Sequence, residues 1–139
     1  MNRRQSPSVR RGAPLAATVL ALLAGWGPSL AEPPPSPALS RGRALYESRC
    51  GGCHSLDAHR VGPLHRGLMG RQAGRVPHFD YSAALRASAV MWSASTLETW
   101  LRDPEALIPG QHMNYSVESA EDRRLIIQYL GTATHDSPP

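Results

Sequence analysis

The chain has 139 residues, of which 41% are hydrophobic and 6% aromatic, with fifteen arginines, no lysine and eleven acidic residues. Four of the arginines lie before residue 31 and all the acidic residues lie after it, so residues 32–139 carry eleven charges of each sign. A formally neutral domain lacks the positive excess that supports binding to nucleic acid or to an anionic membrane, and we exclude a nucleic-acid partner.

Residues 1–31 have the pattern of a secretory signal peptide. A start with four arginines precedes an apolar run over about residues 13–24, and Ser29-Leu30-Ala31 offers small residues at the cleavage positions. The apolar run is shorter than the ~20 residues needed to cross a bilayer, so a cleaved signal is favoured over a retained membrane anchor. We therefore expect a periplasmic protein with no stable membrane insertion after cleavage.

The remaining chain is predicted to hold one small domain. EPPPSP at residues 32–37 is interpreted as an extended leader, because proline lacks the amide hydrogen that helices and sheets use. The domain itself is predicted over residues 38–132, with a flexible tail at 133–139. A domain of this size with so few aromatic residues often needs a metal, a cofactor or a disulfide to be stable.

A first helix is expected from Ala38 to about Arg49. Its packing face is formed by Leu39, Gly42, Ala44, Leu45 and Tyr46. Glycine in the middle of a helix costs about 1 kcal/mol relative to alanine. We therefore expect another helix to press against the backbone at Gly42.

Residues 55–80 are predicted to form a long loop, because glycines and prolines interrupt every regular pattern there. A loop of this length in a compact domain indicates either disorder or a segment that wraps around something. A short helix is expected near residues 82–88. A firmer one begins at Ser93 or Ser95, where Ser95-x-x-Glu98 resembles a capping box, and ends before Pro104.

The C-terminal part is predicted to contain a loop and a final helix. Residues 104–115 are expected to be a loop, and Ser119-x-x-Asp122 is expected to open the last helix, with Gly131 as its C-cap. Alternating strand patterns and internal repeats are absent from the sequence. The prediction is therefore an all-α fold with long irregular loops.

Cys50 and Cys53 are the only cysteines, and His54 follows them directly. A dithiol oxidoreductase uses this spacing but normally beside a βαβ pattern, which is missing here. Structural zinc needs two more ligands, for which His59 and His65 are candidates, and a plain disulfide is a third interpretation. Covalent attachment of haem is the fourth, with each thiol adding to one vinyl group and the histidine binding iron.

With the downstream residues included, the chain resembles class I cytochrome c over nearly all of residues 40–131. The segment GRALYESRCGGCH at residues 42–54 resembles that family's first helix and haem motif, and LIIQYL at residues 125–130 resembles its last helix. Residues 62–74 resemble the loop after the haem motif, and PEALIPGQHM at residues 104–113 resembles the distal loop. The resemblance implies a small cytochrome c fold wrapped around one haem.

The resemblance also implies the site. Cys50 and Cys53 would attach one haem c covalently, and His54 and Met113 would be the axial iron ligands, with Met69 and Met91 as rivals for the distal position. The region of Pro63 would supply the carbonyl that orients the histidine. Three further residues fall at the positions that meet the haem propionates: Arg71, Tyr81 and Trp92. Gln111 departs from the small hydroxylated residue usual beside the methionine.

The implied function is single-electron transfer, not enzymatic catalysis. The expected donor is a membrane quinol-oxidising complex or a dehydrogenase, and the expected acceptor is an oxidase, a reductase or a photosynthetic reaction centre. A cytochrome subunit of a larger periplasmic oxidoreductase is the main alternative. A peroxidase-like or gas-binding haem protein, and the dithiol oxidoreductase, also stay open at this point.

Overall fold

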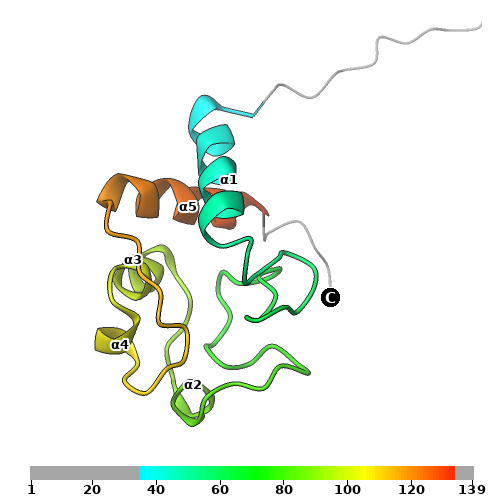
Figure 1. Cartoon of the computed structure of the whole chain (residues 1–139), viewed down its shortest axis with the longest axis vertical. Helices are drawn as coiled ribbons and strands as arrows, with labels where there is room; N and C mark the ends of the chain where they lie inside the picture. Colours follow the sequence, from blue (N-terminus) through cyan, green and yellow to red (C-terminus); the bar gives the residue numbers. More distant parts are fainter. Residues whose placement is uncertain (1–34, 134–139) are drawn as a thin grey trace, which may run out of the picture. The chain divides into compact units, whose positions relative to one another are not determined.

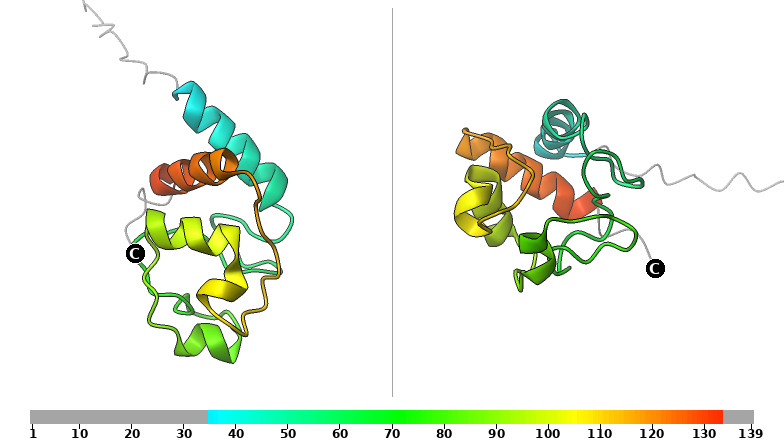
Figure 2. Two further views of the ribbon diagram at one scale, coloured as in Figure 1. Left: turned by 90° about the vertical axis from the view of Figure 1, so that its left-hand side faces the viewer. Right: turned by 60° about the horizontal axis from the view of Figure 1, so that its bottom comes forward.

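The computed structural model describes residues 35–133, and within that range the chain forms five helices and no strand (Figure 1). The helices are α1 (Pro37–Arg49), α2 (Ala83–Ala87), α3 (Ala94–Arg102), α4 (Pro104–Leu107) and α5 (Ala120–Ala133). The predicted signal peptide, residues 32–34 of the predicted leader and residues 134–139 of the predicted tail lie outside the described residues. Helices α3 and α4 lie on one side of the domain, and the loops of residues 51–80 lie on the other (Figures 1 and 2).

Helix α1 crosses α5, as both figures show (Figures 1 and 2). A β-carbon added at Gly42 would lie 2.3 Å from the carbonyl oxygen of Leu125 and 3.1 Å from Cβ of Tyr129. Only glycine therefore permits the two backbones to approach this closely. The expectation that another helix presses on Gly42 is confirmed, and its helix-propensity cost is offset by this contact.

The first turn of α5 is tied to α3 by a buried arginine. Arg123 donates to Oε1 of Glu98 at 2.7 Å and to the carbonyl oxygens of Val117 and Glu118, both at 2.7 Å. The N–H donors of a buried guanidinium need hydrogen-bond acceptors, and these three oxygens provide them. The side chain of Ser119 accepts from the amide of Asp122 at 3.2 Å, as expected for the residue that opens this helix.

Helix α3 begins after Ser93, one of the two predicted starts, but two predicted capping features are wrong. The capping box of α3 is formed by Ser93 and Thr96, with bonds of 3.2 and 2.8 Å, and not by Ser95 and Glu98. Glu98 instead binds the arginine of α5. Gly131 lies inside α5 and is not its C-cap.

The first and fourth helices also begin where a loop or leader was predicted. Pro37 belongs to α1, because its fixed φ suits the first helical turn and Ser36 caps the helix by accepting from the amide of Leu39. Residues 104–107 form α4 by the same arrangement, with Pro104 in the first turn and the Asp103 side chain accepting from the amide of Ala106 at 3.1 Å.

The long loop is organised without a helix of its own. Within the described residues its one ladder contact is an isolated antiparallel bridge between Gln72 and Met91. The loop packs on a core that includes Trp92 and Trp100, whose ring centroids lie 5.3 Å apart in an edge-to-face arrangement. Across residues 35–133, no helix has both the length and the apolar character to span a bilayer.

Candidate functional site

The cysteine motif continues directly from the end of α1. The amide of Cys50 donates to the carbonyl oxygen of Tyr46 at 2.8 Å, and the amides of Cys53 and His54 donate to the carbonyl oxygen of Cys50 at 3.1 and 2.8 Å. This turn brings the three reactive side chains of the motif together. Both cysteines are free thiols, so the disulfide interpretation is not supported.

The thiol of Cys50 does not have the chemistry of a disulfide exchanger's nucleophile. Burial raises the pKa of the Cys50 thiol to about 11. Dithiol oxidoreductases work through a thiol whose pKa is lowered, because the thiolate is the nucleophile. Together with the absence of strands among residues 35–133, this argues against that alternative.

His54 is held by its Nδ1 atom. The Nδ1–H group donates to the carbonyl oxygen of Pro63 at 2.8 Å, and the amide of Gly62 donates to the carbonyl oxygen of Cys53 at 2.8 Å, which closes the loop around the ring. A β-carbon at Gly62 would lie 2.1 Å from Cε1 of His54, so the ring rests directly on the glycine. Burial lowers the pKa of His54 even though the bond to Pro63 opposes it, and the ring therefore presents a neutral Nε2 lone pair.

His65 is a neighbour of this histidine that the sequence did not reveal. Its ring stacks on the ring of His54, with centroids 4.2 Å apart and planes 22° from parallel. Its Nδ1 atom lies 3.2 Å from the hydroxyl of Tyr46, a core residue that is only 4% exposed. Sequence reasoning considered His65 only as a zinc ligand, and residues 35–133 contain no group of three or more His, Cys, Asp or Glu side chains able to hold a metal.

The structure brings together the three residues expected to meet the propionates. The amide of Trp92 donates to the carbonyl oxygen of Arg71 at 2.9 Å, next to the Gln72–Met91 bridge. Arg71 and Tyr81 are close enough to perturb each other electrostatically. Burial lowers the pKa of Arg71 and raises that of Tyr81.

Arg71 lacks a carboxylate partner among the described residues. It donates to the carbonyl oxygens of Arg66 at 2.7 Å and Leu64 at 3.4 Å instead. A partly buried guanidinium whose only partners are carbonyl oxygens can still bind an anion such as a propionate.

Met113 lies on the connection between α4 and α5, where Gln111 braces the backbone. Gln111 is 5% exposed, and its Oε1 atom accepts from the amides of Met113 and of Asn114, the latter at 3.2 Å. Its Nε2 atom donates to the side chains of Asn114 at 3.3 Å and Glu105 at 3.4 Å. Sequence reasoning noted Gln111 as a departure but did not predict this brace.

The rival methionines differ in their surroundings. Met69 and Met113 both pack, partly buried, against the core, whereas Met91 is 50% exposed. Exposure makes Met91 a poor candidate for a ligand in a closed pocket. The choice of Met113 over Met69 stays a prediction.

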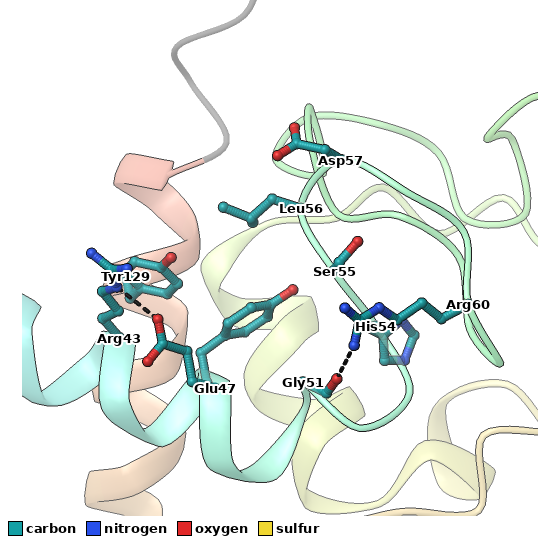
Figure 3. A pocket seen from close by; sticks show the side chains of 10 residues that line it. Arg43, Glu47, Gly51, His54, Ser55, Leu56, Asp57, Arg60 and Tyr129 are labelled. Atoms are coloured by element: carbon teal, nitrogen blue, oxygen red, sulfur yellow. Dashed lines mark hydrogen bonds and ion pairs between the residues drawn. The ribbon is translucent and has the colours of Figure 1, made fainter.

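A groove of about 330 Å³ lies between α1, α5 and the loop of residues 51–60, and one side of His54 contributes to its lining (Figure 3). Arg43 and Glu47 form an ion pair of 2.7 Å on one wall, and Arg60 donates to the carbonyl oxygen of Gly51 at 2.7 Å on the other (Figure 3). The faces of a porphyrin pack against apolar walls. We therefore do not assign this charged groove to a haem.

The comparisons with known proteins agree with one another. The sequence model of the family described as Cytochrome c matches residues 39–134. A cytochrome c from Sesamum indicum is 36% identical over 110 residues, which cover 76% of this chain and 98% of that protein. Cytochrome cH from Methylobacterium extorquens superposes with a TM-score of 0.64 at 30% identity, over 68% of this chain and 97% of that one. The chain belongs to the cytochrome c family.

Membership defines the cofactor and the general role. Cytochromes c carry one covalently attached haem c and act as electron carriers with redox partner proteins, not as enzymes. The residues present fit this group: two free thiols, a neutral imidazole with one nitrogen unoccupied and a guanidinium without a carboxylate partner in residues 35–133. The expected all-α cytochrome c fold and the expected haem are confirmed.

Proposed function

We propose that this protein is a periplasmic electron carrier whose haem is attached through Cys50 and Cys53, with His54 and Met113 as the axial iron ligands. The observation that carries the proposal is the hydrogen bond from Nδ1 of His54 to the carbonyl oxygen of Pro63, at 2.8 Å. It fixes the tautomer in which Nε2 carries the lone pair, on the residue that directly follows Cys53. This is the arrangement that a proximal ligand requires.

The side chains around the site then have distinct roles. When bound, the haem supplies the single-electron iron couple. Met113 would offer a soft, neutral sulfur, which favours ferrous iron and would raise the reduction potential. With His54 and Met113 both serving as ligands, no position would remain for oxygen or peroxide, and the chemistry would be restricted to outer-sphere electron transfer.

Arg71, Tyr81 and Trp92 are proposed to hold the propionates. Partly buried carboxylates need donors, and the guanidinium, the phenol and the indole N–H supply them from one cluster. The same contacts would close the pocket to water and raise the cost of the ferric charge. These three residues thereby affect both retention of the haem and its potential.

We propose export on the basis of residues 1–31, whose basic start, apolar run and small residues fit a cleaved signal peptide. The proposed donor is a membrane quinol-oxidising complex or a dehydrogenase, and the proposed acceptor is an oxidase, a reductase or a reaction centre. Fractionation of the native host tests the location: pigment in the periplasmic fraction supports it, and pigment that stays with the membrane contradicts it.

A cytochrome subunit of a larger periplasmic oxidoreductase is the second candidate. The equal numbers of positive and negative charges in residues 32–139 favour it, because a neutral surface gives little long-range steering toward partners. Size-exclusion chromatography of native extract separates the two. Elution at the mass of the single chain supports the carrier, and elution with a larger complex supports the subunit.

The spectrum of protein produced with a haem-maturation system tests the ligand set. We expect a Soret band, a pigment that stays with the chain in acidified organic solvent, and the weak near-infrared band of methionine-ligated ferric haem. Colourless protein or extractable pigment contradicts covalent attachment. Carbon monoxide binding to the reduced protein at neutral pH contradicts methionine ligation and favours the gas-binding alternative.

A further inference from the structure

The ring of His65 covers one face of the proposed proximal ligand. The two imidazoles are nearly parallel, with planes 22° apart and centroids separated by 4.2 Å. The backbone fixes His65 at the same point: its amide donates to the carbonyl oxygen of Ser55 at 2.9 Å, and its own carbonyl accepts from the amide of Leu68 at 2.9 Å. The stack therefore joins the beginning of the loop to its middle.

A core tyrosine holds the second imidazole in place. The hydroxyl of Tyr46 lies 3.2 Å from Nδ1 of His65, and the ring of Tyr46 packs against that of Tyr129, with centroids 5.3 Å apart. Tyr46 comes from α1 and Tyr129 from α5, so the orientation of His65 is set by the helix crossing. The buried hydroxyl and the half-buried imidazole satisfy each other, which gives a reason for both polar groups at this place.

The stack supplies a constraint that the hydrogen bond to Pro63 does not. The bond to Cβ, the hydrogen bond at Nδ1 and a ligand bond at Nε2 together define the plane of the imidazole, but a hydrogen bond tolerates considerable misalignment, so these contacts leave the ring room to tilt. A flat ring packed against one face narrows that range. The bond to Pro63 therefore sets where the His54 nitrogen points, and His65 limits the tilt of the ring plane.

We propose that His65, oriented by Tyr46, is a positioning residue for His54: it limits the tilt of the proximal imidazole and keeps the reduction potential lower than an apolar side chain would. The inference rests on the proposed axial role of His54. A polar ring beside the ligand stabilises the more highly charged ferric state, and polarity and hydrogen bonding near the iron are two means by which a protein tunes its potential.

Two substitutions in the holoprotein separate the two effects. His65→Leu removes the flat ring and the polar atoms, whereas His65→Phe keeps a flat ring without nitrogen. Redox titration measures the potential, and the hyperfine shifts of the haem methyl protons in the ferric protein report the orientation of the imidazole plane.

We expect both variants to raise the potential, changing the oxidised-to-reduced ratio at a fixed solution potential by up to about tenfold, or about 59 mV for one electron. The pattern of methyl shifts should change in His65→Leu and persist in His65→Phe. Unchanged potential and unchanged shifts in both variants overturn the inference. If either variant fails to mature, Tyr46→Phe tests the same point, since it removes only the hydroxyl and should raise the potential by less.

The matched control is His78→Asn, at an exposed histidine of the same long loop whose φ of 62° also suits asparagine. It should leave the potential and the methyl shifts unchanged. The spectrum of the unmutated protein distinguishes failure of the proposed function from failure of this inference. If that spectrum lacks the features of histidine–methionine ligation, the proposed function is refuted. If the spectrum has them but the His65 variants behave like the unmutated protein, only the role of His65 is refuted.

Discussion

The loop that carries His54 and the loop that carries Met113 position their side chains by different means. An imidazole has two nitrogens, so one can be anchored to a carbonyl oxygen while the other is free. A thioether sulfur has only weak acceptor capacity and no N–H or O–H donor to anchor it. The proximal loop accordingly holds the side chain of His54 itself, through Pro63 and the stacked ring. The distal loop holds the backbone of Met113, through Gln111.

This difference indicates which contacts keep each ligand residue in place. The proximal ligand depends on contacts made to its own ring, and the distal ligand depends on a loop that keeps its shape. Damage to the proximal side should therefore appear in stability and ring orientation. Damage on the distal side should appear as easier loss of the ligand.

The largest effect should come from removing the thioether links that attach the haem to the chain. In a Cys50→Ala, Cys53→Ala double variant the haem has no thioether links, and a core this small loses the group that fills it. We expect a largely unfolded chain by circular dichroism. Cooperative, native-like melting of this haem-free protein would contradict the view that the haem organises the fold.

Met113→Ala should open the distal coordination position while the proximal side stays intact. The near-infrared band should disappear, carbon monoxide should bind the reduced protein, and the oxidised-to-reduced ratio at a fixed potential should rise at least about tenfold, since the thioether favours ferrous iron. Met69→Leu and Met91→Leu are the controls and should retain the band. Loss of the band in Met69→Leu instead would reassign the ligand.

Gly62→Ala should damage the proximal side by overpacking. The new β-carbon would fall 2.1 Å from Cε1 of His54, and such insertions typically cost about 1–3 kcal/mol. Gly52→Ala is the control, because a β-carbon there meets nothing within 4 Å. Denaturant unfolding followed at the Soret band measures both. Equal stability of the two variants would show that the His54 ring does not rest on residue 62 in the holoprotein.

Gln111→Ala should weaken the distal side without removing the ligand. Two backbone amides lose their acceptor, and at about 1 kcal/mol for each hydrogen bond the methionine-off state becomes roughly thirtyfold more accessible. Binding of added imidazole to the ferric protein should tighten by that factor. His112→Ala, at an exposed position of the same loop, should bind imidazole as the parent does. A parent-like affinity in Gln111→Ala would exclude the brace.

The features predicted from the sequence were those that local chemistry determines. The cost of a glycine in the middle of a helix predicted the crossing at Gly42, whereas the carbonyl that orients His54 was implied by the resemblance to cytochrome c. The capping box of α3 was misplaced because Glu98, a good local candidate, is used by Arg123 from a distant helix. Helix α4 has four residues, too few to show a hydrophobic period.

His65 and Gln111 could not be assigned their roles in advance for a related reason. The stack on His54 joins side chains that meet only when the loop folds back, and nothing in a single loop histidine marks it as a partner. Gln111 lies next to its hydrogen-bond partners in sequence, but a glutamine that braces a loop looks the same in a sequence as one that faces water. Both roles depend on the tertiary arrangement.

The crossing at Gly42 also links the haem attachment to the far end of the domain. Helix α1 ends at Arg49, directly before Cys50, and it packs on α5, the last helix. A side chain at position 42 would push the two helices apart, and a rigid helix would carry that displacement along its length to the cysteine motif. The absence of a side chain at one position therefore contributes to the alignment of the haem from about two helical turns away.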